Sequence, residues 1–143
     1  MDQDPTARRL VIGVCVLLLV DVVGGLLAIA NDVNSAGEAW SGQATLAAPL
    51  PMMVAQAVLT VVAVRWRGTP AVVAAGLLAL ACLVSGISGF FDGQLGKDGL
   101  AGWLVAFQVL LVVTTIAVGL LALQRLVRVT QGRQAARSGH LDG

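Results

Sequence analysis

Residues 10–30 decide the fold class, and they read LVIGVCVLLLVDVVGGLLAIA. A helix rises about 1.5 Å per residue and the hydrocarbon layer of a bilayer is about 30 Å thick, so a helix over this run is long enough to span a membrane. The only charged side chain inside it is Asp21. The run therefore predicts a transmembrane helix and raises the question of what a carboxylate does at its centre.

Three more apolar windows follow, over residues 46–64, 71–91 and 100–123. The chain is 57% hydrophobic and only 12% charged, whereas an average soluble domain is about 25% charged. A soluble bundle would need a broad polar face on every helix, which these windows lack. We therefore predict an all-α, polytopic membrane protein, a four-transmembrane-helix up-down bundle. A segment over 1–9 precedes the membrane domain over 10–127, and a basic, disordered tail follows over 128–143.

The basic residues predict the orientation, because lysine and arginine are retained on the cytoplasmic side of membrane proteins. Of the nine basic residues, only Lys97 lies in a segment expected outside. The other eight precede the first window, lie between the second and third, or follow the fourth: Arg8, Arg9, Arg65, Arg67, Arg125, Arg128, Arg133 and Arg137. Both termini should be cytoplasmic. The composition, rich in Ala, Val, Gly and Arg, is typical of a GC-rich genome and favours the bacterial inner membrane.

A cleaved signal peptide is the alternative interpretation of the first window. Arg8 and Arg9 form a basic start, and Ala28-Ile29-Ala30 fits a small-x-small cleavage site. However, the apolar run exceeds the usual 7–15 residues, and Asp21 interrupts the part that should be most hydrophobic. We therefore expect the first window to be retained as a membrane helix.

Residue types that carry enzyme chemistry are scarce. The single histidine, His140, lies in the polar tail, and the sequence has no metal-spaced cluster and no phosphate-binding glycine loop. Cys15 and Cys82 both lie inside predicted spans, where small apolar packing residues are expected. The glycine-rich segment over 89–99 predicts a turn-rich outer cap. We therefore expect no enzyme activity, no catalytic residue, no metal, no cofactor and no nucleic-acid partner.

A polar site inside the membrane is predicted from depth. Counting at 1.5 Å per residue from the outer ends of their windows places Asp21, Gln56 and Gln108 each about 12–15 Å deep. Thr115 lies on the same helix face as Gln108. Protonating an ordinary aspartate at pH 7 costs about 4 kcal/mol, whereas a charge at a helix centre costs from about 3 to above 10 kcal/mol. In a dry site Asp21 should therefore be protonated and donate to Gln56 or Gln108. If water reaches Asp21, it can titrate.

Small residues form one stripe on each helix, and such stripes let helix backbones approach closely in lipid. We predict that the helices pack through these stripes, with Gly24, Gly25, Ala75, Ala79, Gly86, Gly89 and Gly119 as helix-packing positions. The stripe of the third window could instead face a second copy of the chain. The expected partners are thus the lipid bilayer and either a homo-oligomer or another membrane protein.

Two functions remain open. In the first, Asp21 is a structural hydrogen-bonding residue in a membrane protein that interacts or assembles with other membrane components. In the second, Asp21 titrates and couples proton movement to a small solute, as intramembrane carboxylates often do. The stretch Leu19-Val20-Asp21-Val22-Val23-Gly24 resembles the first helix of the small multidrug-resistance transporters. That resemblance implies a shared proton and cation site at Asp21, although the family has glutamate there and a shorter chain.

Overall fold

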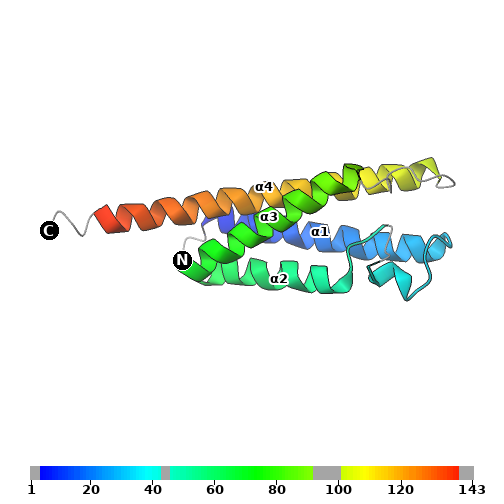
Figure 1. The fold of residues 1–143 in the computed structure, drawn as a ribbon, viewed down its shortest axis with the longest axis horizontal. Helices are drawn as coiled ribbons and strands as arrows, with labels where there is room; N and C mark the ends of the chain where they lie inside the picture. Colours follow the sequence, from blue (N-terminus) through cyan, green and yellow to red (C-terminus); the bar gives the residue numbers. More distant parts are fainter. Residues whose placement is uncertain (1–3, 43–45, 92–100, 139–143) are drawn as a thin grey trace.

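The computed structural model describes residues 4–42, 46–91 and 101–138, and within these ranges the chain contains no strand. Its four α-helices are α1 (Pro5–Ala30), α2 (Leu50–Arg65), α3 (Thr69–Phe91) and α4 (Gly102–Ser138). A short 3-10 helix, η1 (Glu38–Trp40), lies in the connection from α1 to α2. The helices lie along the long axis of the molecule, and α1 begins at the end where α4 finishes (Figure 1). The prediction of an all-helical chain is confirmed.

The ends of α1 follow from local sequence. The Asp4 side chain accepts a hydrogen bond from the backbone N–H of Thr6 at 3.0 Å, and Pro5 occupies the first helical turn, where no N–H is needed. At the other end, the Asn31 side-chain amide donates to the carbonyl oxygen of Leu27 at 2.9 Å. Capping at both ends thus fixes α1 as a helix of 26 residues.

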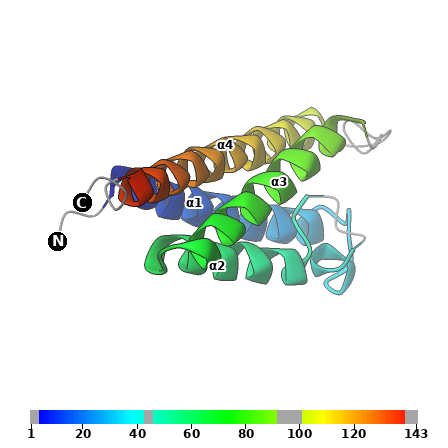
Figure 2. The same cartoon turned by 60° about the vertical axis from the view of Figure 1, so that its left-hand side comes forward.

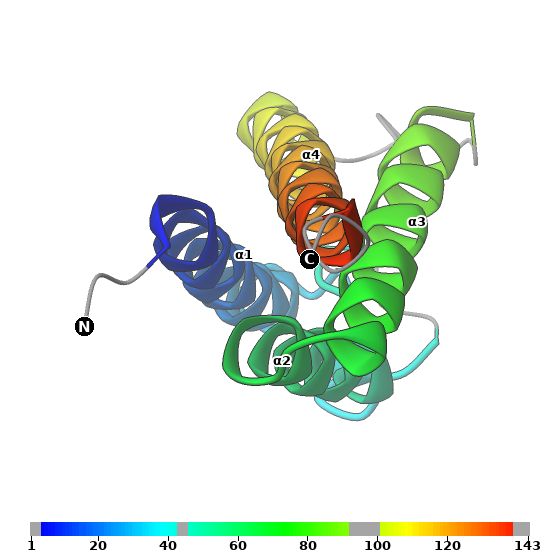
Figure 3. The same cartoon turned by 90° about the vertical axis from the view of Figure 1, so that its left-hand side faces the viewer.

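Consecutive helices are neighbours in space. α1 contacts α2 and α4, and α3 also contacts α2 and α4, which closes a ring of four helices (Figure 3). α3 crosses its neighbours obliquely (Figure 2). Between α2 and α3 the chain reverses within three residues, at Gly68, whose φ of 76° lies in the left-handed region that favours glycine. The arrangement is an up-down bundle.

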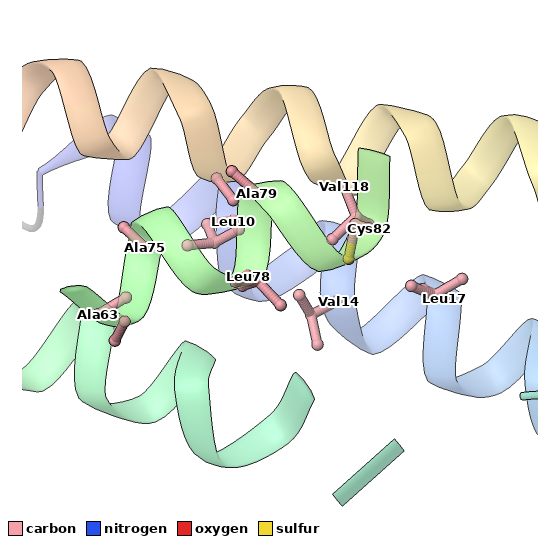
Figure 4. Packing of buried hydrophobic residues seen from close by; sticks show 11 residues of the cluster. Leu10, Val14, Leu17, Ala63, Ala75, Leu78, Ala79, Cys82 and Val118 are labelled. Carbon is pink, nitrogen blue, oxygen red and sulfur yellow. The ribbon is translucent and has the colours of Figure 1, made fainter. Parts of the chain in front are cut away.

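The main core lies at the centre of this ring and is built from small and branched side chains. Ala75, Ala79 and Cys82 of α3 belong to one buried cluster with Leu10 and Val14 of α1 (Figure 4). The remaining buried members are Leu17, Ala63, Ala74, Leu78, Val118 and Ala122. Alanines at so many core positions allow the helix backbones to approach closely, as expected for helices that pack in lipid.

Apolar side chains also cover the outside of all four helices. Leu19, Val54, Leu80 and Val113, one from each helix, are between half and two-thirds exposed. In water such a surface would favour association, whereas in a bilayer it faces hydrocarbon. α1, α3 and the 102–132 part of α4 are each long and apolar enough to cross a membrane. Length, composition and surface together indicate a membrane protein.

Two element boundaries differ from the sequence-based prediction. The second window was expected to be helical from residue 46, but α2 begins at Leu50 because Pro49 and Pro51 allow a helix to start there and not earlier. Its 16 residues reach only about 24 Å. The tail over 128–143 was expected to be disordered, but α4 continues as a helix to Ser138. The predicted cap over 92–99 and His140 lie outside the described residues.

Candidate functional site

Asp21 lies on the buried face of α1 and is only 1% exposed. Its Oδ1 accepts a hydrogen bond from the backbone N–H of Ala48 at 2.8 Å. Ala48 precedes Pro49, a position that disfavours helical backbone, so its N–H has no intrahelical acceptor. In the interior of a membrane protein an unpaired N–H costs several kcal/mol. The carboxylate therefore satisfies a backbone donor in the non-helical segment that leads into α2.

Two glycines beside Asp21 let this connection approach α1. A Cβ placed on Gly24 would lie 1.8 Å from the carbonyl oxygen of Leu46, and one placed on Gly25 would lie 2.5 Å from the indole ring of Trp40. Real Cβ atoms do not approach other heavy atoms so closely. The face of Asp21, Gly24 and Gly25 thus packs against the α1–α2 connection, where a neighbouring helix had been expected.

The connection fills the end of the bundle at which α1 finishes. Leu46 is fully buried and packs with Ala28 of α1 and Leu104 of α4 in a second apolar cluster. The ring of Phe107 in α4 also lies within 2.9 Å of a Cβ built on Gly24. The segment from Leu46 to Pro49 is therefore held between α1 and α4 by apolar packing and by one hydrogen bond to a carboxylate.

A second polar contact, at the opposite end of the bundle, was not found from the sequence. Arg125 of α4 is only 8% exposed. Its Nε donates to the carbonyl oxygen of Ala63 in α2 at 3.2 Å, and its Nη1 donates to Oδ2 of Asp4 and to Oγ1 of Thr6 at 3.5 Å. One guanidinium therefore joins α1, α2 and α4. We name this contact the Arg125 clamp.

The clamp changes the acidity of Asp4. Partial burial raises the pKa of Asp4, but hydrogen bonds from Thr6 and the charge of Arg125 outweigh this effect, so the pKa lies below its ordinary value. The sequence did offer a signal for the clamp. Asp4 directly precedes Pro5, which is typical of a helix N-cap, and it is the acid nearest in sequence to Arg8 and Arg9. The pairing of Asp4 with Arg125, 121 positions away, leaves no pattern in the local sequence.

The clamp also gives a reference level for the four predicted polar residues. Arg125 contacts both Asp4 and Ala63, so these residues lie at similar depth. Counting from them along each helix, Asp21 and Gln108 both lie about 25 Å away, whereas Gln56 lies only about 10 Å away. By this helical count, Asp21 and Gln108 lie at a similar level and Gln56 lies nearer the clamp. Because α2 begins at Leu50 and not at residue 46, a helical count from residue 46 does not give the depth of Gln56.

All four candidate residues are buried, but they do not form the expected network. Asp21 Oδ2 and Gln56 Oε1 have no hydrogen-bond partner among the described residues, so Asp21 makes no bond to Gln56. The Thr115 hydroxyl donates to the carbonyl oxygen of Leu111 in its own helix at 2.8 Å. Gln108 is 5% exposed. In place of a glutamine side chain, the partner of Asp21 is the backbone N–H of Ala48.

The helix-packing positions predicted on α3 and α4 lie at close approaches between these two helices. A Cβ on Gly86 would lie 2.5 Å from Ile116, and one on Gly119 would lie 2.8 Å from Leu83. At Gly89 the corresponding distance, to Val112, is 3.1 Å. Ala75 and Ala79 belong to the central core (Figure 4). The stripe on α3 thus packs within one chain.

Few side chains among the described residues could bind a metal ion or act as a nucleophile. Among the described residues, no group of three or more His, Cys, Asp and Glu side chains could hold a metal ion. Cys15 is exposed on α1 and Cys82 is buried in the core. Comparison with known proteins found no matching family model, curated protein or solved structure. The site therefore has to be interpreted from its own geometry.

Proposed function

We propose that this chain is an integral protein of the bacterial inner membrane with four spans and both termini in the cytoplasm. The 16 residues of α2 reach about 24 Å, which is less than the roughly 30 Å of a hydrocarbon layer, and the buried non-helical segment that begins at Leu46 precedes α2 within the same span. Arg8, Arg65 and Arg128 all lie toward the end of the bundle that carries the Arg125 clamp. The positive-inside rule makes this end cytoplasmic.

Thiol labelling tests this topology. In a background with Cys15 and Cys82 replaced by alanine, a cysteine at Ser35 should react with an impermeant reagent in intact cells, and a cysteine at Ser138 should react only after lysis. Reaction of the Ser138 reporter in intact cells contradicts the proposed orientation.

Within this topology, the function we infer is that of a structural or interaction component of the membrane, with Asp21 as a buried hydrogen-bonding residue. The observation that carries it is the 2.8 Å bond from the Ala48 N–H to Asp21 Oδ1. Asp21 already has a structural task, which is to satisfy a backbone donor where α2 cannot begin. The close contacts at Gly24 and Gly25 support this assignment, since they leave the carboxylate enclosed by the α1–α2 connection.

A small proton-coupled transporter is the second candidate, and one observation favours it. Asp21 Oδ2 is buried and has no hydrogen-bond partner among the described residues. An ionised oxygen in that position is costly, and a bound proton would lower the cost. A residue that binds and releases this proton could couple it to a solute.

Two substitutions separate these candidates. Asp21→Asn keeps an acceptor oxygen for the Ala48 N–H, whereas Asp21→Leu removes it and leaves a buried donor unpaired, at a cost of about 1–3 kcal/mol. A structural role predicts that Asn is nearly as stable as wild type in detergent and that Leu is clearly less stable. Asp32→Asn, an exposed acid in the α1–α2 connection, is the matched control.

Proton release on addition of hydrophobic cations is the second readout. The structural proposal predicts none from wild type across a broad panel of solutes. Release by wild type that Asp21→Asn abolishes, without loss of stability, would establish the transport function in its place.

A further inference from the structure

Five arginines at the clamp end of the bundle differ from Arg125 in their surroundings. Arg125 is buried and paired, whereas the five others are exposed: Arg8, Arg9, Arg65, Arg67 and Arg128. They come from the start of α1, the end of α2, the turn before α3 and the later part of α4. We name these five residues the arginine belt.

The arginines of the belt all lie near the depth of the Arg125 clamp. Relative to the Arg125 clamp, Arg9 lies about 8 Å toward the bundle centre, because it is five residues beyond Asp4. Arg65 lies about 3 Å and Arg128 about 5 Å in the other direction. The polar headgroup region of one leaflet is about 5–7 Å thick. The belt thus spreads over about 13 Å, roughly twice that thickness, and a long arginine side chain at its inner edge can still bring its charged group to the headgroup layer.

Among the described residues, no acidic side chain pairs with the arginines of the belt. The ion pair that the structure describes joins Arg125 to Asp4, and the belt arginines form none within residues 4–42, 46–91 and 101–138. The described acids Asp32 and Glu38 lie in the α1–α2 connection, at the far end of the bundle. The clamp therefore consumes the one described carboxylate at this end and leaves five exposed guanidinium groups.

An aromatic ring lies within the belt. Trp66, between Arg65 and Arg67, is 57% exposed even though its ring is large and apolar. Indole rings favour the headgroup level of a bilayer, where one edge is apolar and the other is wet. The exposed ring of Trp66 and the two arginines beside it can therefore contact lipid headgroups together.

We propose that the arginine belt binds the phosphate groups of anionic phospholipids in the cytoplasmic leaflet. A guanidinium presents paired N–H donors that match phosphate oxygens in a bidentate geometry, and lipid phosphates are the anions that share its layer. The proposal rests on the bilayer placement given under Proposed function and adds the partner that this end of the bundle recognises.

Lipid binding to the purified chain in detergent tests the proposal. Native mass spectrometry counts bound phosphatidylglycerol and phosphatidylcholine for wild type, for a quadruple variant with Arg8→Gln, Arg9→Gln, Arg65→Gln and Arg67→Gln, and for the single variant Arg128→Gln. Gln124→Ala, an exposed uncharged position on α4 at the same end, is the control. If the quadruple variant does not fold, the single variant still decides.

Wild type and Gln124→Ala should bind phosphatidylglycerol more tightly than phosphatidylcholine, and affinity should fall roughly fivefold for each arginine removed. Added salt should weaken binding in wild type more than in the variants. Inorganic phosphate at the same concentration should not raise thermal stability.

Equal binding of the two lipids by wild type, or unchanged phosphatidylglycerol affinity in the arginine variants, overturns the proposal. Equal stabilisation by inorganic phosphate would overturn it in favour of a simple anion site. These measurements use purified protein and do not involve Asp21, so their failure leaves the labelling and Asp21 experiments to judge the proposed function separately.

Discussion

Substitution of Gly24 by alanine gives the sharpest structural prediction, because its new Cβ would lie 1.8 Å from the Leu46 carbonyl oxygen. That oxygen belongs to the backbone and cannot rotate away. Overpacking a core typically costs about 1–3 kcal/mol, and movement of the connection would also stretch the Ala48–Asp21 bond, which contributes about 1 kcal/mol. Alanine gains about 1 kcal/mol over glycine from helix propensity. The net loss of unfolding free energy should be about 1–3 kcal/mol.

Two other glycines, Gly13 and Gly132, provide matched controls for Gly24→Ala when the stability of the variants is compared. A Cβ on Gly13 of α1 would lie 2.7 Å from Cδ1 of Leu121, a methyl group that can rotate, and a Cβ on Gly132 would meet nothing within 4 Å. Gly13→Ala should therefore be close to neutral, and Gly132→Ala should be stabilising by up to about 1 kcal/mol.

Thermal unfolding in detergent, followed by tryptophan fluorescence, measures the stability of all three variants. Trp40 reports on the contact between α1 and the connection, because its ring lies against Gly25. The expected order of stability is Gly132→Ala, then Gly13→Ala, then Gly24→Ala. If Gly24→Ala unfolds at or above the temperature of Gly132→Ala, the connection does not lie against α1 and the reasoning is refuted.

Further predictions concern the Arg125 clamp and the thiols. Arg125→Gln should lower the unfolding free energy by about 1–3 kcal/mol, and Arg125→Lys should recover only part of it, because a lysine cannot span two acceptors in a fixed fork; equal stability of all three proteins in denaturant titrations would contradict the clamp. Because the pKa of Asp4 is lowered in the folded chain, its stabilising contribution is present above the ordinary value of 3.8 and is lost as pH falls through the folded value. The acid-induced loss of stability should therefore be smaller in Asp4→Asn, and an identical pH profile would argue against the pair. A membrane-permeant maleimide should label Cys15, which is exposed, and spare Cys82 in the core until the protein unfolds; mass spectrometry of the labelled protein identifies the modified thiol.

The sequence predicted the parts of this fold that depend on composition and spacing. Apolar windows of sufficient length predicted all four helices, and the small-residue faces predicted the close approaches at Gly86 and Gly119. Asp21, Gln56, Gln108 and Thr115 are all buried in the structure. These features are local, because hydrophobic run length and helix periodicity are properties of neighbouring residues.

Features that depend on contacts between distant segments were predicted poorly. A helix from residue 46 predicts that Asp21 bonds a glutamine side chain. Pro49 and Pro51 start the helix later, and the resulting free N–H at Ala48 becomes the nearest donor. The proline pair was visible in the sequence, but the return of residues 46–49 against Gly24 depends on the whole connection. The Arg125–Asp4 pair was missed for the same reason.

We infer that Asp21 holds the backbone N–H of Ala48 inside the membrane domain, and amide hydrogen exchange at Ala48 measures this interaction. With ¹⁵N-alanine labelling, the resonance of Ala48 is assigned by its loss in Ala48→Gly. The claim predicts strong protection of this amide in wild type and in Asp21→Asn, and much faster exchange in Asp21→Leu, with core alanines such as Ala75 unchanged in all three. Equal protection of Ala48 in wild type and Asp21→Leu would contradict the claim.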